Sequence, residues 1–528
     1  MHRILLLILM FFPGYGLAAF DPATCSQTTI RCVGDGMEYN TDNGAADDSP
    51  IFRSAVNASV AGDTIVIRGG TYHHTVDSAN LYFVEVDVSG SLLAPITITG
   101  AEGEAPAHII GFGFPENGGE PPRRDEEIFR VNGDHIHLYD LEMSYSSRFG
   151  ITFNGNYGRA ERIHVHDNWH DGVTIGRTGT SVTGTVVRES HFHNMRHGSG
   201  VIISRGSDDT NSVSDSIIEY NISYENGYWW NGDTLEKVPA VSGDVAGGGN
   251  SDGFGASKNC NDVTAAAGQN DNTCPNNIYR HNIAWHNADD GFDVSIGRGS
   301  FLGYNFAFNN GPEGNRGFKV LRSVWGGLSY VGNISIQNVA PSSRGIELRF
   351  AENGLSAHNI VLGEAAHGLY ISTAPSENAS TTRVHNNIEY GNGNPPAITS
   401  GTVVSNNWME NSNGAPEIAN IGIHHSDIDT NPVAATTTRE RRDLIYTQIR
   451  NALLPIEGSA LIDAGLFLAD VHCATANDDA QNPHDPSDTS CKQWIGAAPD
   501  IGPFEYGLDG AGTIPSIALP RPPTISIM

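Results

Sequence analysis

A motif of alternating apolar residues, Asn-φ-x-φ-x-Asn (φ, apolar), recurs through the middle of the chain and constrains the fold more than any other feature. Its copies begin at Asn221, Asn282, Asn305 and Asn333, with degenerate copies at Asn359 and Asn387. The apolar residues alternate with a period of two, so each copy predicts a short β-strand rather than a helix. Self-similarity over such a length is typical of a solenoid, in which successive repeats stack on one another.

A second motif, Gly-φ-x-φ, follows the first. Its copies begin at Gly172, Gly200, Gly253, Gly291, Gly317, Gly345 and Gly368. Two or three short strands per turn of about 25 residues predict a parallel β-helix whose successive coils lie about 4.8 Å apart. We expect the Asn side chains to end strands at turns and to form ladders between coils. Two of the intervals between successive Gly residues of this motif are longer than the others, which indicates coils that carry the loops 227–251 and 257–277.

The two ends of the solenoid differ from its middle. Ser49-Pro50 predicts the start of a cap helix, because Pro is favoured at the first helical position, and the helix should end by Gly62. Such a cap covers the core and strand edge that an open coil would expose. Beyond about residue 410 the repeat fades. We therefore expect an all-β, parallel β-helix domain over 20–410 and an irregular C-terminal tail, 411–528, packed on it.

Composition bounds the cellular setting and the partners. Residues 1–19 read as a secretory signal peptide, and no later run is long and apolar enough for a transmembrane helix. The six cysteines of an exported chain favour three disulfides, with 15 pairings open. They lie in local couples, Cys25 with Cys32, Cys260 with Cys274, and Cys473 with Cys491. A net charge of −30 argues against nucleic acid or an anionic membrane as partner.

Stacking of the Gly-φ-x-φ strands would bring four carboxylates together. Asp252 and Asp290 precede the Gly of adjacent coils, and Asp289 and Asp293 lie beside Asp290. Four carboxylates that are ionised together need a cation or shared protons, and hard oxygen ligands select Ca²⁺. The pattern predicts a catalytic Ca²⁺ site, with a purely structural Ca²⁺ site or a solvated acidic patch as alternatives.

One of only four lysines in the chain falls beside these carboxylates. Lys319 lies one coil past Asp293, and Arg316, Arg322 and Arg344 lie on the same or the next coil. A lysine beside Ca²⁺ and arginines is pushed toward its neutral form, in which it can act as a general base. The alternative is a simple salt bridge between Asp293 and Lys319 across two coils.

These residues also carry a family resemblance. Asp252-Gly253-Phe254, Asp289-Asp290-Gly291-Phe292-Asp293 and Asn315-Arg316-Gly317-Phe318-Lys319 resemble the calcium-dependent pectate lyases of polysaccharide lyase family 9. The resemblance implies a right-handed parallel β-helix. It implies Ca²⁺ bound by Asp252, Asp289, Asp290 and Asp293, and Lys319 as the base. Phe292 departs from the pattern, where we expect Trp.

The implied enzyme is a secreted, monomeric lyase that cleaves a polyuronate, most simply homogalacturonan, by β-elimination. Arg316, Arg322 and Arg344 would bind sugar carboxylates beside the Ca²⁺. Two alternatives remain. A glycoside hydrolase on the same fold could use Asp289 and Asp290 as acid and base, and a non-catalytic β-helix could bind polysaccharide without turning it over.

A histidine pattern stands apart from the acidic cluster. His164 and His166 recur 27 residues later as His191 and His193, which is the spacing of one coil. We expect His164 to stack on His191, and His166 on His193, facing outward. A polar surface ladder is the simpler interpretation, and a transition-metal site is the alternative.

Overall fold

The computed structural model describes most of the chain between residues 25 and 461, and every structural statement below refers to these residues. They are 25, 27–41, 47–75, 81–113, 126–177, 180–204, 211–231, 234–238, 251–256, 260, 274–294, 299–311, 316–321, 328–338, 341–349, 354–372, 382–409, 415–416, 418, 420, 423–432, 435, 437–454 and 459–461. The signal peptide expected over 1–19 and Arg322 lie outside the described residues.

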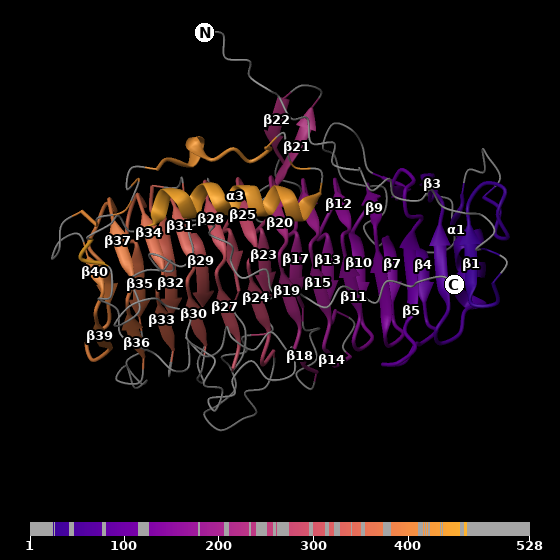
Figure 1. The fold of residues 1–528 in the computed structure, drawn as a ribbon, viewed down its shortest axis with the longest axis horizontal. Helices are drawn as coiled ribbons and strands as arrows, with labels where there is room; N and C mark the ends of the chain where they lie inside the picture. The colour runs from indigo at the N-terminus through magenta and orange to yellow at the C-terminus, as the bar shows by residue number, and fades with distance from the viewer. Residues whose placement is uncertain are drawn as a thin grey trace, which may run out of the picture.

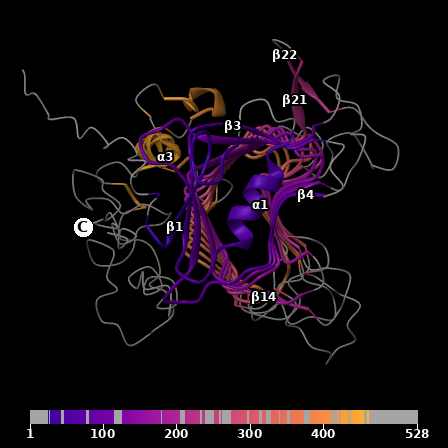
Figure 2. The same cartoon turned by 90° about the vertical axis from the view of Figure 1, so that its right-hand side faces the viewer.

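Three long parallel sheets wind around one core and form the walls of a β-helix (Figure 1). Seen along its axis, the coil is closed on all sides by strands that repeat from turn to turn (Figure 2). The predicted parallel β-helix is thereby confirmed. A sheet built this way has one face on the coil interior and one outside. In sheet 3 the apolar residues of the Asn motif, such as Ile283 and Phe306, lie on the outer face, where they pack with Ile445 and Ile449 of the tail. The residues between them, such as Ala284 and Ala307, face the interior, so the expectation that the apolar positions of this motif face the stacked core is wrong.

Sheet 1 contains 13 of the described strands. In spatial order they are β1 Ile30–Val33, β2 Thr64–Ile67, β5 Ile96–Gly100, β8 Ile136–Tyr139, β11 Arg159–Glu161, β15 Val186–Arg188, β19 Ile217–Glu219, β24 Ile278–Arg280, β27 Phe301–Gly303, β30 Ser329–Val331, β33 Leu355–Ala357, β36 Arg383–His385 and β39 Val403–Ser405.

Sheet 2 is made of the Gly-φ-x-φ strands, the N-terminal strands that precede them and one strand that follows them. In order these are β4 Tyr82–Val86, β7 Glu127–Val131, β10 Phe149–Phe153, β13 Val173–Ile175, β17 Val201–Ile203, β23 Phe254–Ala256, β26 Phe292–Asp293, β29 Arg316–Leu321, β32 Arg344–Arg349, β35 Leu369–Ser372 and β38 Ala397–Ile398.

Sheet 3 is made of the Asn-φ-x-φ-x-Asn strands and their N-terminal neighbours. In order these are β3 Gly70–His73, β6 Ala107–Ile110, β9 Leu141–Ser144, β12 His164–His166, β16 His191–His193, β20 Ile222–Tyr224, β25 Ile283–Trp285, β28 Phe306–Phe308, β31 Ile334–Ile336, β34 Ile360–Leu362, β37 Ile388–Tyr390 and β40 Trp408–Met409. Two short pairs stand outside the walls, β14 Val182–Thr183 with β18 Val213–Ser214, and the antiparallel hairpin β21 Tyr228–Asn231 with β22 Thr234–Lys237.

Buried asparagines form the two predicted ladders between coils. The first runs through Asn221, Asn282, Asn305, Asn333, Asn359, Asn387 and Asn407, with each Nδ2 donating to the next Oδ1 at 2.8–3.2 Å. The second runs through Asn226, Asn287, Asn310 and Asn338 and ends on Glu364. Each amide also bonds backbone groups at the turn, so the ladders satisfy polar groups that would otherwise be buried without partners.

Helix α1, Ser49–Asn57, caps the N-terminal end as predicted. Pro50 lies in its first turn, and Phe52 packs edge-on against Tyr72 and Phe83, with ring centroids 4.9 and 4.7 Å apart. The end-on view shows α1 inside the coil, where it covers the core (Figure 2).

Two of the three expected cysteine couples form disulfides. These are Cys25–Cys32, before the first coils, and Cys260–Cys274, in the loop that follows β23. The structure does not test the third predicted disulfide, because Cys473 and Cys491 both lie outside the described residues. The pairing of Cys473 with Cys491 therefore stays a prediction.

The tail contains a regular helix that the fading repeat does not predict. After the short 3-10 turn η4, His425–Asp427, helix α3 runs over Thr438–Leu453 along sheet 3 (Figure 1). Its N-terminus is a capping box in which Thr437 and Glu440 exchange hydrogen bonds, and Ile445, Ile449 and Leu453 are buried on the sheet. The signal was present in the sequence as Thr-x-x-Glu before an apolar period near 3.6.

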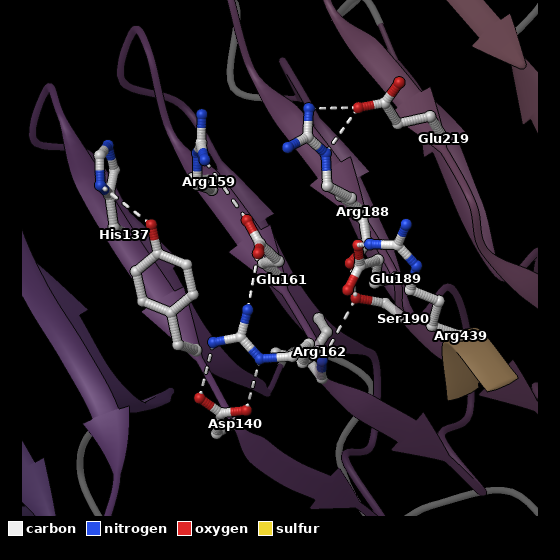
Figure 3. Close-up of polar contacts among 12 residues, drawn as sticks. His137, Asp140, Arg159, Glu161, Arg162, Arg188, Glu189, Ser190, Glu219 and Arg439 are labelled. Atoms are coloured by element: carbon white, nitrogen blue, oxygen red, sulfur yellow. Dashed lines mark hydrogen bonds and ion pairs between the residues drawn. The ribbon is translucent and has the colours of Figure 1, made fainter. Parts of the chain in front are cut away.

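Charged side chains on the outside of sheet 1 pair between neighbouring coils (Figure 3). Arg162 contacts Asp140 at 2.8 Å and Glu161 at 2.6 Å. Arg439 of α3 reaches Glu189 at 2.9 Å, which ties the tail helix to the body. Within the described part of the chain, no helix is both long and apolar enough to cross a membrane.

Candidate active site

Four neighbouring strands of sheet 2 (β23, β26, β29 and β32) build the predicted site. Their parallel pairing aligns Gly255 with Asp293, Asp293 with Lys319, and Lys319 with Glu347. The rings of Phe254, Phe292 and Phe318, one residue earlier in each strand, stack in the core at 5.0 and 4.7 Å. The aromatic stack therefore sets the register that places the outward row.

Three of the predicted carboxylates converge. Asp252, Asp289 and Asp290 each offer a carboxylate oxygen, and these oxygens lie within 4.8 Å of one another. The Asp290 amide donates to Asp252 Oδ1 at 3.1 Å, and the Gly253 amide donates to the Asp290 carbonyl at 3.1 Å. A Cβ on Gly253 would lie 2.6 Å from the Gly291 carbonyl oxygen, so the approach of the two coils requires glycine after Asp252.

These carboxyl groups resist being ionised together. Burial raises the pKa of Asp252 well above its ordinary value, and the charges of Asp289, Asp293 and Asp290 raise it further. Burial and Asp290 raise the pKa of Asp289 to about 7, and the pKa of Asp293 is raised by burial. Close oxygen donors of this kind fit a hard cation such as Ca²⁺. Two oxygens that each lie about 2.3–2.6 Å from one Ca²⁺ can be as far apart as the 4.8 Å that bounds these oxygens.

Lys319 lies against the carboxylates on the next coil. Its Nζ is 2.9 Å from Asp290 Oδ2 and 2.7 Å from Asp293 Oδ2. Burial lowers the pKa of Lys319, but Asp290 and Asp293 outweigh burial and raise it. The cross-coil salt bridge between Asp293 and Lys319 is thus present, and it favours the protonated form of Lys319 unless another cation offsets the charge of these carboxylates.

The predicted arginines are held by a residue to which the sequence pattern assigned no role. Arg316 pairs with Glu347, and Arg344 Nη1 lies 2.5 Å from Glu347 Oε1. The Arg344 guanidinium also lies 3.9 Å above the ring of Tyr370. Glu347 is fully buried and follows Lys319 in the outward row. The arrangement keeps two cations beside the lysine in defined positions.

The hairpin β21–β22 adds a lysine that sequence reasoning did not place at the site. Burial lowers the pKa of Lys237, and the charge of Asp289 acts on it in the opposite direction. Tyr228 and Trp229 are buried, whereas the Trp230 side chain is 51% exposed. The hairpin projects from the body (Figures 1 and 2). Its signal in the sequence was the pair Gly232-Asp233 between the two strands, since a two-residue connection that begins with Gly is typical of a hairpin.

Comparison with known protein families identifies one that includes this site. The family model described as "Pel9A-like, right handed beta helix region" matches residues 36–320, which include all four aspartates and Lys319. The chain belongs to this family. The right-handed β-helix and the resemblance to the family 9 pectate lyases are thereby confirmed.

Two curated pectate lyases are similar in sequence to this chain over more than half of its length. Pectate lyase L of Dickeya chrysanthemi is 22% identical over 516 residues, covering 94% of this chain and 98% of the relative. Pectate lyase PEL9 of Emericella nidulans is 26% identical over 352 residues, covering 56% and 81%. The crystal structure of pectate lyase Pel9A aligns over 86% of this chain and 90% of its own, with 17% identity and a TM-score of 0.45. The expectation of a pectate lyase-like enzyme agrees with the family and with the names of both curated relatives.

Proposed function

We propose that the chain is a secreted lyase that cleaves pectate, or a closely related polyuronate, by β-elimination. The observation that carries the proposal is the contact of Lys319 with buried Asp290 and half-buried Asp293, beside the oxygens of Asp252 and Asp289. An acidic cluster built only for solubility would not bury its members, because burial of unpaired carboxylates is costly.

The proposed cofactor is Ca²⁺, held by Asp252, Asp289 and Asp290, with Asp293 as the fourth ligand that the family resemblance implies. When bound, Ca²⁺ would neutralise a sugar carboxylate and so make the adjacent C5 proton more acidic. Its charge would also lower the pKa of Lys319 by offsetting the carboxylates that now raise it.

Neutral Lys319 removes the C5 proton, and the electron pair of that bond moves toward the carboxylate. Return of this pair forms the C4–C5 double bond and breaks the C4–O4 bond, and the leaving oxygen takes a proton from solvent water. The products are a shortened chain and a 4,5-unsaturated uronide. Arg316 and Arg344, and Arg322 by expectation, bind uronate carboxylates and stabilise the developing negative charge. Glu347 orients the first two by holding both guanidinium groups.

Pectate is favoured as substrate because both curated relatives are named pectate lyases. Secretion is supported by the apolar N-terminal run over 1–19 and by the two disulfides, which persist in oxidising compartments. We expect the enzyme to act as a monomer.

The test is near-ultraviolet absorbance of polygalacturonate digests, with saturating Ca²⁺ or excess chelator. Lys319→Ala removes the base. Lys319→Arg is the matched control for charge, since arginine keeps the contacts to Asp290 and Asp293 but stays protonated. We expect a Ca²⁺-dependent rise in absorbance that falls by roughly 10²–10⁴-fold in both variants, the usual contribution of a general base.

Each other outcome has a distinct meaning. A rise that survives in Lys319→Arg would keep the lyase and exclude Lys319 as the base. Release of reducing ends without absorbance would identify a hydrolase. Polygalacturonate binding without release of either product would identify a binding protein.

A further inference from the structure

Four histidines gather on the outer face of sheet 3, away from the acidic cluster of sheet 2. Strand pairing aligns His164 with His191 and His166 with His193, and the residues between them, Val165 and Phe192, are buried in the core. The aligned rings stack with centroids 4.6 and 5.1 Å apart. The predicted outward stacking is therefore present, and both strands aim their imidazoles at one patch.

The ring nitrogens of three of these histidines converge. His164, His191 and His193 each offer a nitrogen, and these atoms lie within 4.8 Å of one another. His164 Nε2 and His193 Nε2 are 2.8 Å apart. One of two ring nitrogens at this distance must accept a hydrogen bond, so at least one of the two rings is neutral. Neutral imidazole is the form that binds metal ions.

Neighbouring groups orient the rings in the way that supports metal-binding histidines. His193 Nδ1 contacts the side-chain oxygen of Asn194, which can only accept, so the proton lies on Nδ1 and the lone pair of Nε2 faces His164. His164 Nδ1 faces Glu142 Oε1 at 3.9 Å and can carry a proton there when its Nε2 gives one up. An outer hydrogen bond such as the one between His193 and Asn194 fixes the tautomer of a ligating imidazole.

Carboxylates lie beside the three histidines. Asp167 Oδ2 and Glu142 Oε1 contact His166 at 2.8 Å and 3.1 Å. Arg441 of α3 lies 3.4 Å from His191 Nε2. Two carboxylates therefore face one guanidinium at this patch, so the patch does not repel a metal ion strongly.

We propose that His164, His191 and His193 bind one transition-metal ion of the Zn²⁺ type. Three imidazole nitrogens favour such an ion over Ca²⁺, which prefers the oxygen donors of sheet 2. The His164 side chain is 35% exposed, so an ion can enter and a water molecule can complete the coordination. The bound ion would tie β12 to β16 at the place where Arg441 of α3 meets sheet 3.

The experiment uses the full chain purified without a histidine tag, in millimolar Ca²⁺ so that the oxygen site is saturated. Co²⁺ is added as a spectroscopic probe, followed by Zn²⁺ as competitor. We expect a visible Co²⁺ absorption band that saturates at one ion per chain and is displaced by Zn²⁺. The double variant His164→Gln/His193→Gln should weaken Co²⁺ binding at least about 100-fold, beyond what loss of an outer partner causes.

Two control variants locate the ion. His135→Asn removes a histidine that stacks on Tyr157 just before β8 of sheet 1, at a left-handed backbone position (φ 53°) that Asn tolerates. Asp252→Asn alters the acidic cluster. Both should keep the Co²⁺ band. Absence of the band in the unaltered chain, its survival in the double variant, or its loss in Asp252→Asn would overturn the proposal. Thermal melts without added metal confirm that every variant is folded.

Discussion

Two aspartates of the cluster contact Lys319, and only one of them, Asp293, is outside the group of three converging carboxylates. Asp293 contacts Lys319 at 2.7 Å and aligns with it in the strand pairing, whereas Asp290 contacts it at 2.9 Å and also converges with Asp252 and Asp289. Asp293 is therefore the carboxylate that can be altered beside the lysine while the three converging oxygens are kept.

Replacing Asp293 with Asn should lower the pKa of Lys319, because the carboxylate stabilises the ammonium form and raises that pKa. A base with a lower pKa is deprotonated at lower pH, so the ascending limb of the plot of kcat/KM against pH should shift to lower pH. Loss of one opposite charge at contact distance predicts a shift of about one unit or more. The profile is measured on polygalacturonate at saturating Ca²⁺.

The matched control is Asp140→Asn, which removes a carboxylate that pairs with Arg162 on the outside of sheet 1. It should leave the pH profile in place. An unmoved limb in Asp293→Asn would show that a group other than Lys319 titrates in the profile.

Among the elements, the asparagine ladders join coils that are far apart in sequence. Asn221 and Asn282 are adjacent in space although 61 residues separate them. The intervening segment contains β21 and β22, and the register resumes unchanged beyond it. The ladder and the stacked sheets therefore accommodate a long insertion while the strand register on both sides of it is kept.

Replacing Asn305 with Ala should destabilise the chain strongly. Asn305 is fully buried, donates to Asn333 and to the Tyr279 carbonyl, and accepts from Asn282. Buried groups left without partners cost about 1–3 kcal/mol each, so we expect a loss of at least about 3 kcal/mol. Asn407→Ala, at the less buried end of the ladder, should cost less in the same denaturant titration. Equal losses would contradict a special role for the ladder interior.

Glu364 ends the second ladder where other coils place an asparagine. It is buried and accepts from Ser335 Oγ at 2.8 Å and from Asn338 Nδ2 at 2.9 Å. Burial raises its pKa to about 7, although its hydrogen bonds oppose this. The folded chain thus favours the protonated form, and its contribution to stability is complete below the ordinary pKa near 4.5 and is lost as pH rises through about 7.

Glu364→Gln should remove this pH dependence. A pKa raised from 4.5 to about 7 corresponds to about 3 kcal/mol. The free energy of unfolding of the natural chain should therefore fall by this amount, relative to the variant, between about pH 4 and pH 8. Denaturant titrations at constant Ca²⁺ measure the difference. A constant difference across this range would show that the pKa of Glu364 is not raised.

Particular residues show how far the sequence predicts the fold and the site. The Gly-φ-x-φ copies predict the alignment of Asp293 with Lys319, because equal spacing forces equal register in stacked coils. Pairing of Arg316 and Arg344 with Glu347 was not predicted, since side-chain direction within a row does not follow from spacing. The hairpin and α3 were not predicted, because both lie where the repeat is interrupted or fades. Each nevertheless carries its own local signal, a turn in the hairpin and a capping box in α3.

On the scale of the whole molecule, the chain carries a net charge of −30 while its proposed substrate is also a polyanion. Basic residues near the site are few, and those described are paired, as Arg316 and Arg344 are with Glu347. The overall field therefore opposes approach of the substrate, and the local contacts overcome it only at short range.

Added salt should consequently raise kcat/KM on polygalacturonate between about 10 mM and 100 mM, because the Debye length falls to about 10 Å and screens the long-range repulsion. We expect a change of several-fold, measured at fixed free Ca²⁺. Sodium and potassium chloride should act equally, which separates screening from specific ion binding. A steady decrease from the lowest salt would show that attraction to local cations dominates at all distances.

Helix α3 gives this linear molecule a property that stacked coils lack. A solenoid whose repeats touch only their neighbours can fray one coil at a time from an open end. Arg439 and Tyr446 instead reach back to Glu189 and Phe306, far along the axis. Separation of the coils from the C-terminal end first requires α3 to detach from several coils, which raises the free-energy barrier to unfolding. If the chain is secreted as proposed, that barrier sets its half-life among extracellular proteases more directly than equilibrium stability does.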